Sequence, residues 1–298
     1  MKSAKTPVPS VSKPFLFLLS ALFIFLWASG FIAAKYGLPY AEPFTLMAFR
    51  FAVGSVVLVP ACWLLKTRWP LSFIQTFHIL IAGFGIQTVY LIGVYYGIYM
   101  GISTGVTALI VGLQPLLTGI MAGIFLKETV TRGNWFGLYL GFAGLVLIVW
   151  DRILSPNDNF YGVALLLLGL LGITAGTLYQ KKYCKEFDVR SAVAMQNVMS
   201  FIVMFILALL FEERTVLWSG EFIFAVLWSA IGLSVIAICL YYWLVQRGAA
   251  TKVTSLIYLS PPTTMLMGWW IFSELVTWKA VIGMFLAMTG VALVVRKK

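Results

Sequence analysis

The side chains that could do chemistry in this sequence are the few ionisable ones inside its long apolar segments. Arg50 lies within the stretch LMAFRFAVG, and His78, the single histidine, lies near the start of another apolar segment. A cation in a lipid-embedded segment is costly and must face protein or water. Arg50 could clamp a substrate carboxylate or tie helix ends together near one surface, and its position a third of the way into its segment favours the tie. His78 is expected at the interface rather than as a proton carrier.

The acidic residues and cysteines give no sign of enzyme chemistry. None of the ten Asp and Glu residues falls in the middle of a long apolar segment, so the carboxylate relay of many ion-coupled proteins is missing. Three distant cysteines and one histidine do not form a metal site. A nucleophile–base pair and a phosphate-binding loop are also missing. The sequence predicts a protein that is not an enzyme, with no catalytic residue, metal or cofactor.

A segment with a proline near its start and a glutamate at its end occurs twice. QPLLTGIMAGIFLKE begins at Gln114 and SPPTTMLMGWWIFSE begins at Ser260, and we call the displacement from the first to the second the repeat shift. It carries Pro115 onto Pro261 and Glu128 onto Glu274. Proline kinks a helix and frees a carbonyl, so these bends are expected to shape a central cavity, the alternative being a packing role only. The glutamates are expected to anchor the start of the following helix, where backbone donors are unpaired.

A set of aromatic and uncharged polar residues falls near mid-depth of the apolar segments. These candidate substrate-binding residues are Trp27, Gln87, Tyr90, Tyr99, Gln114, Thr174, Tyr258 and Ser260. Apolar walls with a few polar groups suit a flat, amphipathic, net-neutral solute. For each residue, ordinary helix packing is the alternative.

The elements that carry these residues must be membrane-spanning helices. The chain is 61% hydrophobic and 10% charged, with a mean hydropathy of +0.98, whereas soluble domains are about a quarter charged. A span needs about 20 apolar residues, and in lipid each helix must pair its own backbone groups. We therefore expect an all-α integral membrane protein. Its ten helices are expected near 15–36, 43–65, 73–99, 103–126, 133–150, 160–181, 189–211, 220–246, 250–272 and 277–295.

The distribution of basic residues predicts orientation. Sixteen of the 21 Lys and Arg residues fall on the loops and tails of one side, four fall on the other side, and Arg50 lies inside a span. Basic residues are enriched in cytoplasmic loops, so both termini are expected in the cytoplasm, in a bacterial-type inner (plasma) membrane. The net charge of +11 then reflects topology, and no nucleic-acid partner is expected.

The chain also reads as two copies of one unit. At the repeat shift, residues 30–149 and 176–295 share 23 identical pairs out of 120, including Gly137 with Gly283 and Gly144 with Gly290. Each unit, 1–152 and 153–298, holds five expected spans. Because five is odd, the second unit enters the membrane from the opposite side, which is an inverted-topology repeat typical of secondary transporters.

At this point the sequence resembles a known family. LWASGFIAAK in the first span, LMAFRFAVG in the second, and the two proline-to-glutamate segments are similar to the EamA repeats of the drug/metabolite transporter superfamily. Within it, the chain looks closest to the YddG-type amino acid exporters. The resemblance implies ten helices in an inverted five-plus-five arrangement, a central cavity and export of small metabolites, without fixing the substrate.

Taken together, these observations predict a secondary transporter that needs no ATP. It is expected to export small metabolites by alternating access, with neutral and aromatic amino acids as the leading class. Its site is expected to be bordered by structural or gating residues that include Arg50 and the paired prolines and glutamates. A channel-like or other passive membrane protein, and an exporter of drugs or other metabolites, are the alternatives. A membrane enzyme fits least.

Overall fold

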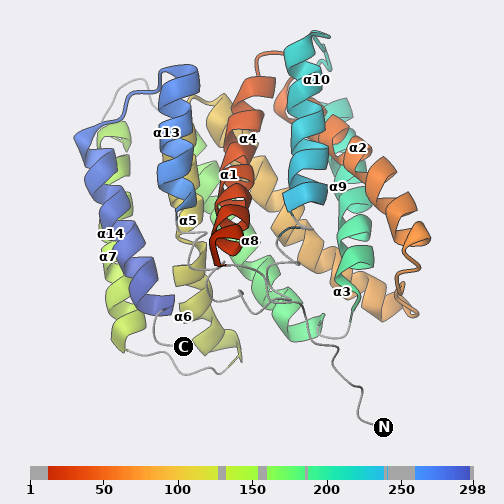
Figure 1. Ribbon diagram of the computed structural model, residues 1–298, viewed down its shortest axis with the longest axis horizontal. Coiled ribbons are helices and arrows are strands. Elements are labelled where there is room, and N and C mark those ends of the chain that lie inside the picture. Colours follow the sequence, from red (N-terminus) through yellow and green to blue (C-terminus); the bar gives the residue numbers. More distant parts are fainter. Residues whose placement is uncertain are drawn as a thin grey trace.

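The computed structural model describes residues 13–126, 132–153, 160–184, 187–237, 240 and 259–295. In these ranges the chain is helical between its loops, and an isolated antiparallel bridge joins Ala41 to Val216. The helices run side by side as a bundle, with α1 (Lys13–Gly37) in the middle of the view in Figure 1. The all-α prediction is therefore confirmed for the part of the chain that is described.

The helices of the two halves follow the same order. The first half continues with α2 (Pro43–Leu64), α3 (Phe73–Gly83), the π-helix η1 (Phe84–Val89), α4 (Tyr90–Tyr99), α5 (Thr104–Gly112), α6 (Gln114–Leu126) and α7 (Arg132–Ile153). The second half contains α8 (Phe160–Tyr183), α9 (Val189–Phe211), α10 (Gly220–Leu227), the π-helix η2 (Trp228–Ala237), α13 (Ser260–Phe272) and α14 (Trp278–Val295). The repeat shift carries the bounds of α6 onto those of α13, and the first residue of α7 onto that of α14.

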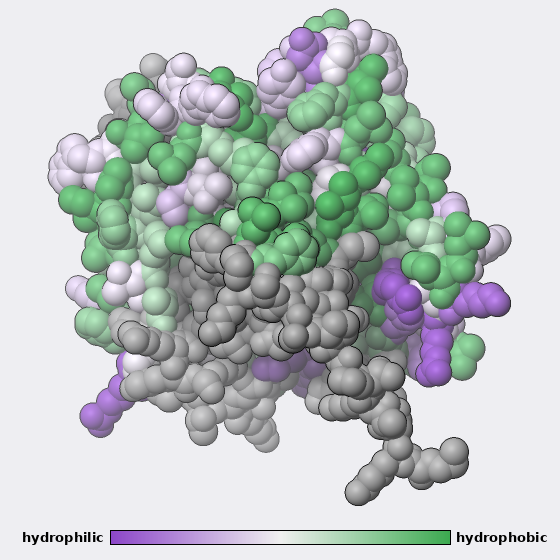
Figure 2. Space-filling model, viewed as in Figure 1, coloured by the Kyte–Doolittle hydropathy of each residue, from purple (hydrophilic) through white to green (hydrophobic). Residues whose placement is uncertain are grey.

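Seven helical segments of the described chain are long and apolar enough to cross a membrane. They are Leu18–Gly37, Pro43–Leu64, Phe73–Tyr99, Thr104–Gly123, Phe160–Tyr183, Val189–Phe211 and Gly220–Ala237. The shorter apolar stretches Trp135–Leu147 and Trp278–Gly290 lie in α7 and α14. The first part of the expected ninth span lies outside the described residues. Most of the coloured surface in Figure 2 is hydrophobic, and the strongly hydrophilic residues lie toward its upper and lower margins, as expected of a multi-pass membrane protein.

Side-chain caps fix where several helices begin. The hydroxyls of Ser72, Ser103 and Ser219 accept hydrogen bonds from backbone N–H groups in the first turns of α3, α5 and α10. The carboxylate of Asp188 does the same for α9. Such caps pair donors that the helix itself leaves free, so each of these helix starts is set by a short polar residue.

Loops from both halves meet on each of the two faces of the bundle. The loops 38–42 and 212–219 are joined by a hydrogen bond from the Leu217 N–H to the Tyr40 carbonyl. The loop residue Glu274 binds the start of α5, and we call this side the Glu274 face. On the opposite side, the loop that carries Lys66 and Arg68 meets α9, where the Ser191 hydroxyl donates to the Arg68 carbonyl. We call this side the Lys66 face.

Glycines allow α3, η1 and α4 to lie directly on α8. A Cβ atom on Gly85 would collide with the backbone of Gly176, and a Cβ atom on Gly93 would collide with the backbone at Gly169. These glycines let the backbones of the helices approach closely, as small residues do between membrane helices. This approach brings η1, with its widened turn, against the second half of the chain.

The fourth expected span is two helices rather than one kinked helix. α5 ends at Gly112 and α6 begins at Gln114, so the break falls at Leu113, just before Pro115. The Leu113 carbonyl still accepts hydrogen bonds from the N–H groups of Leu116 and Leu117. The proline thus sits in the first turn of the new helix, where its missing N–H costs little.

Candidate functional site

A cluster of polar side chains lies between α2, η1 and α9, in the interior of the bundle. The Thr88 hydroxyl is 3.1 Å from the Ser200 hydroxyl, and the Gln87 amide nitrogen donates to the Gln196 amide oxygen at 3.4 Å. Gln196 also donates to the Ile79 carbonyl at 3.2 Å. Thr88, Gln196 and Ser200 are at most 4% exposed. The widened turn of η1 therefore presents its polar side chains to α9, and π-turns often mark functional positions.

Arg50 extends from α2 to α4, the helix that follows η1. Its Nη1 donates to the hydroxyl of Tyr95 at 3.0 Å, and its guanidinium lies 5.8 Å from the ring centre of Phe51 and 6.0 Å from that of Tyr95. Tyr95 is 1% exposed. Within the described chain, Arg50 is bound to a tyrosine of α4 rather than to helix-end carbonyls, so the kind of tie expected from the sequence differs from the one that is present.

Four polar side-chain atoms of α2, η1 and α9 are buried without a hydrogen-bond partner. They are Nε of Arg50, Oγ of Ser55, Oε1 of Gln87 and Oδ1 of Asn197. The other amide atom of Asn197, Nδ2, donates to the Val193 carbonyl of its own helix at 3.0 Å. Buried polar atoms without partners are uncommon and often have a functional reason. This cluster therefore has unused capacity for binding polar groups.

A second group of expected residues gathers at the helix breaks. Gln114 begins α6, and its amide donates to the Thr177 hydroxyl of α8 at 3.2 Å. Ser260 is 5% exposed at the start of α13, and Pro261 lies beside Gly112, where an added Cβ would come within 3.1 Å of the proline ring. The two proline breaks thus lie close to each other, from opposite halves of the chain.

Three further residues from the expected set have varied surroundings. Trp27 is 39% exposed on α1, with its ring 5.9 Å from that of Phe23. Thr174 is fully buried, and its hydroxyl donates to the Leu170 carbonyl of its own helix, so that hydroxyl serves the helix backbone. Tyr99 is 53% exposed at the end of α4, next to Tyr96.

Three residues expected from the sequence remain to be located. Two of them, Tyr258 and Glu128, lie outside the described residues. Tyr90 begins α4 and is partly buried against the core, and its backbone carbonyl lies where α4 crosses Gly169 of α8. Of the eight candidate substrate-binding residues, Gln87 and Tyr90 are therefore near neighbours at the junction of η1 and α4, whereas Gln114 and Ser260 belong to the breaks.

Glu274 anchors a helix start, but not the one expected. Its carboxylate accepts from the backbone N–H of Thr104 at 2.9 Å and from the Thr104 hydroxyl at 2.9 Å, so it caps α5 of the first half. Lys35, in the last turn of α1, donates to the same carboxylate at 2.6 Å. The following helix α14 is capped instead by Thr277, whose hydroxyl accepts from the Ala280 N–H. Glu274 thus accepts hydrogen bonds at the start of a helix, as expected, but that helix is α5 and not the following helix α14.

A second carboxylate cluster on the Glu274 face was not anticipated from the sequence. Glu212, after α9, accepts from the backbone N–H groups of Phe44 and Thr45 at 2.6 and 2.7 Å and from the Tyr96 hydroxyl at 3.1 Å. In return, Glu42 accepts from the N–H groups of residues 213 and 214. Each half thus accepts hydrogen bonds from backbone N–H groups of the other half. Glu42 precedes Pro43, a helix-start signal, but nothing in the sequence pairs it with a loop of the other half.

His78 lies where the sequence predicted, near the Lys66 face. Its Nδ1 is 2.8 Å from the Tyr179 hydroxyl, and its ring stacks on that of Tyr183 with centres 4.9 Å apart. Lys182 lies over the same tyrosine ring at 5.2 Å. These groups join α3 to the end of α8, and their described contacts do not include the polar cluster.

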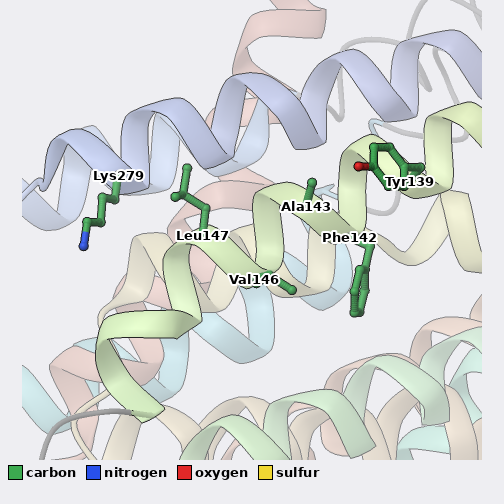
Figure 3. A pocket seen from close by; sticks show the side chains of 6 residues that line it. All are labelled: Tyr139, Phe142, Ala143, Val146, Leu147 and Lys279. Atoms are coloured by element: carbon green, nitrogen blue, oxygen red, sulfur yellow. The ribbon is translucent and has the colours of Figure 1, made fainter.

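Two cavities of the described chain have apolar linings. A cavity of about 510 Å³ is bordered by Tyr139, Phe142 and Val146 of α7 and by Lys279 of α14, which Figure 3 shows along the surface of that helix pair. Another of about 590 Å³ lies between α2, α3 and α9 and includes Trp63 and Trp69. Surface grooves of this kind face lipid in a membrane protein, so we place the candidate site on the polar contacts rather than in these cavities. Among the described residues, no group of His, Cys, Asp or Glu could hold a metal ion.

Comparison with known proteins gives a consistent family. The model of the EamA-like transporter family matches residues 14–150 and again residues 160–296. The chain is 26% identical over 284 residues to the uncharacterized transporter YvbV of Bacillus subtilis, covering 93% of this chain and 90% of that one. It is 24% identical to the uncharacterized inner membrane transporter YedA of Escherichia coli K12, covering 84% and 80%. It is also 23% identical to the WAT1-related protein At3g02690 of Arabidopsis thaliana, covering 91% and 67%.

A solved structure has the same overall fold. It is a crystal structure that covers 95% of this chain and 98% of its own chain, with a TM-score of 0.64 and 17% sequence identity. The similarity extends over nearly the whole chain. Together with two family matches that span most of the sequence, it leads to one conclusion: this chain belongs to the EamA-like transporter family, and it is a membrane transporter of small molecules and not an enzyme.

Proposed function

We propose that this protein is a secondary transporter that exports small, amphipathic, net-neutral metabolites, with neutral and aromatic amino acids as the leading class. In this proposal the chain consists of two five-helix units, residues 1–152 and 153–298, inverted relative to each other in the membrane. The units alternate between two arrangements that open a central site to one side at a time. The Lys66 face is cytoplasmic and the Glu274 face is external, which follows from the excess of basic residues.

The contact between α7 and α14 is the main observation that supports this proposal, because it bears on the inverted relation of the two units. A Cβ atom on Gly144 would collide with the backbone at Gly283, and one on Gly290 would collide with the backbone at Gly137. The repeat shift turns Gly137 into Gly283 and Gly144 into Gly290, so exchanging the halves reproduces the same two contacts. Because the order is reversed along the second helix, the helices are antiparallel. A two-fold axis that relates antiparallel membrane helices lies in the membrane plane, as in an inverted repeat.

The π-helices support the same relation. The repeat shift carries η1 (Phe84–Val89) onto positions 230–235, which lie inside η2 (Trp228–Ala237). η1 packs against α8, whereas η2 packs against α1, and the same shift carries α1 almost exactly onto α8. Both halves therefore widen the same helix at the same place and set it against the first helix of the other half. A widened turn in each half suits parts that change contacts between two states.

The polarity of the candidate site favours a net-neutral solute. In the described spans the groups near mid-depth include the amides of Gln87 and Gln114, the hydroxyl of Ser260 and the aromatic rings of Trp27 and Tyr90. Amides and hydroxyls orient a ligand without demanding one sign of charge, and aromatic rings offer apolar area. An amino acid with a neutral side chain combines both requirements.

The experiment that tests this function is transport by the purified protein in proteoliposomes. Labelled phenylalanine, leucine, glutamate, lysine and glucose are compared under identical conditions, with protein-free liposomes as the control. Saturable uptake of phenylalanine and leucine, competing with each other, is the expected result. Saturable uptake of glucose or of a charged amino acid alone would contradict the proposed substrate class, and uptake that rises linearly with concentration would contradict alternating access.

A further inference from the structure

Three of the four unpartnered side-chain atoms of α2, η1 and α9 have complementary chemistry. Nε of Arg50 is a charged donor, whereas Oε1 of Gln87 and Oδ1 of Asn197 are acceptors. Their neighbouring atoms are already used: Gln87 donates to Gln196, Asn197 donates to Val193, and Arg50 donates to Tyr95 through Nη1. These bonds fix the side chains and leave one donor and two acceptors unpaired in the protein interior. A ligand with an anionic acceptor at one end and several donors at the other would pair all three.

The charge of Arg50 also lacks a counterion within the described chain. The ion pairs found there are Lys35 with Glu274 and Arg190 with Asp188, both near the ends of helices. A guanidinium stays charged at any ordinary pH, and a buried charge without an opposite charge is strongly unfavourable. The Tyr95 hydroxyl and two aromatic rings reduce this cost but supply no full negative charge. A carboxylate brought by a solute would supply it.

The spacing of the donor and the acceptors fits one class of solute. Arg50 and Gly54 lie one turn apart on α2, which is about 6 Å along a helix axis, and Oδ1 of Asn197 lies 2.9 Å from the position of a Cβ on Gly54. In an α-amino acid the nitrogen and the carboxyl carbon are about 2.5 Å apart, and each ionic hydrogen bond adds roughly 2.8 Å. An amino acid held by two such hydrogen bonds therefore spans a length comparable to the one helix turn that separates Arg50 from Gly54.

We propose that Arg50, Gln87 and Asn197 form a binding site for the zwitterionic backbone of an α-amino acid, between α2, η1 and α9. The Arg50 guanidinium holds the carboxylate, and the amide oxygens of Gln87 and Asn197 hold the ammonium group. Glycine at position 54 lets α2 lie against Asn197, because a Cβ there would come within 2.9 Å of Oδ1. This proposal rests on the proposed transport of amino acids and adds the residues that would select them. Of these, the sequence placed only Gln87 in the substrate-binding set.

Equilibrium binding to the purified full-length protein in lipid nanodiscs tests the site. The probe is labelled phenylalanine, displaced by unlabelled phenylalanine, by its methyl ester, which lacks the carboxylate, and by N-acetylphenylalanine, which lacks the ammonium group. For the wild type we expect both derivatives to bind at least about tenfold more weakly, as for the loss of a hydrogen bond to a charged group. Equal binding of either derivative would overturn the assignment without any variant.

Variants then assign each end of the zwitterion to a side chain. In Arg50→Gln, phenylalanine should fall to the affinity of its methyl ester, while the ester itself is unchanged, and Arg50→Lys should restore part of the difference. In Asn197→Ala, phenylalanine should lose its advantage over N-acetylphenylalanine but keep it over the ester. A merely structural role would weaken all three ligands by the same factor, and that result would overturn the proposal.

The matched control is Tyr95→Phe, which removes the side-chain hydrogen bond described for Arg50 and leaves its charge. If Arg50 acts on the carboxylate, Tyr95→Phe keeps the preference for phenylalanine over its ester. If Arg50 serves only to tie α2 to α4, Tyr95→Phe and Arg50→Gln have equal effects, and the inference is wrong although amino acid transport can still be correct. Saturable transport of solutes that lack an α-amino acid backbone, without transport of phenylalanine, would overturn both.

Discussion

At the scale of single residues, carboxylates that cross between the halves hold the Glu274 face together. Glu274 belongs to the second half and caps α5 of the first, and it pairs with Lys35 of α1. The backbone bends into the left-handed region at Ser273, with φ of 52°, so that the Glu274 N–H can bond the Gly268 carbonyl. A side chain at Gly268 would collide with the Glu274 carboxylate. The turn at Ser273 and the absence of a side chain at Gly268 thus leave room for the Glu274 carboxylate.

Glu274→Gln is the variant that measures this contact. The amide keeps the size of the side chain but removes its charge and one acceptor, while Lys35 and the two Thr104 donors remain. Because the Glu274 side chain is 8% exposed and that of Lys35 is 32% exposed, we expect a loss of about 1–3 kcal/mol of stability. Thermal unfolding in detergent measures it. Glu213→Gln, on the exposed neighbour of Glu212, is the control and should unfold at the wild-type temperature; an equal shift in both variants would contradict the capping role.

The sequence could predict the chemistry of such residues but not their partners. A glutamate after an apolar segment is expected to meet unpaired helix donors, and Glu274 does. The choice of α5 instead of α14 depends on the crossing of the two halves, which no local pattern encodes. Asn197 and Gln196 were missed for the same reason: their side chains are polar on an apolar helix, yet the weak periodicity of an almost uniformly apolar span does not show which face is buried.

At the scale of elements, glycines set a very close contact between the two halves. α7 and α14 approach so tightly that Gly144 and Gly290 each lie against a backbone carbonyl of the other helix. The sequence singled these positions out because they recur at the repeat shift. It could not show that the repeated glycines of one half meet those of the other, since that requires the three-dimensional relation between the halves.

Gly144→Val and Gly290→Val should destabilise the protein to a similar extent. A valine side chain has no space at either contact, so α7 and α14 must separate, and overpacking of this kind costs about 1–3 kcal/mol. Gly220→Ala is the control, because a Cβ there has nothing within 4 Å. The three variants are compared by thermal unfolding. Strong destabilisation by only one of the two valines would argue against a two-fold relation between the helices.

The helix breaks lead to a prediction about water access. If the breaks at Gln114 and Ser260 line the transport path, single cysteines there should react with a membrane-impermeant thiol reagent in at least one open state. The same holds for Trp27 and Tyr90. The background must lack the three native cysteines, Cys62, Cys184 and Cys239. A cysteine at Phe285, which is 65% exposed on α14, is the lipid-facing control and should stay unreactive. Protection at all four positions would exclude them from the path.

At the scale of the whole molecule, hydropathy predicted the helical spans. Seven spans are present as expected in the described chain, and two more correspond to α7 and α14. This succeeds because lipid imposes one solution, a helix, on every long apolar segment. The breaks inside spans are harder to locate, since they depend on which backbone groups find partners in neighbouring helices. For the fourth span the proline showed that a break exists, and the structure moved it to Leu113.

Orientation in the membrane follows from the charge distribution and can be tested directly. If the chain has the ten spans expected from the sequence, sixteen basic residues lie on one side against four on the other, and both ends of the chain should face the cytoplasm. A reporter fused after Lys298 should be active inside the cell. A second fusion in the loop 212–219 is the internal control and should be active only outside. The opposite pattern would also reverse the assignment of the Lys66 and Glu274 faces.

Energy coupling is the property in which we expect the whole molecule to differ from ion-driven transporters. Proton or sodium coupling usually needs an ionisable carboxylate inside the membrane, and in the described chain the carboxylates of Glu212 and Glu274 cap helix ends at the surface. His78 is held by Tyr179 and Tyr183 near the Lys66 face, and Arg50 cannot release its proton. We therefore expect saturable uptake of phenylalanine into proteoliposomes without a pH or sodium gradient, accelerated by phenylalanine on the opposite side.

His78→Ala should keep most of this activity. Accumulation against a gradient that collapses when the proton gradient is removed would show that transport is coupled to protons, and its loss in folded His78→Ala would identify His78 as the carrier.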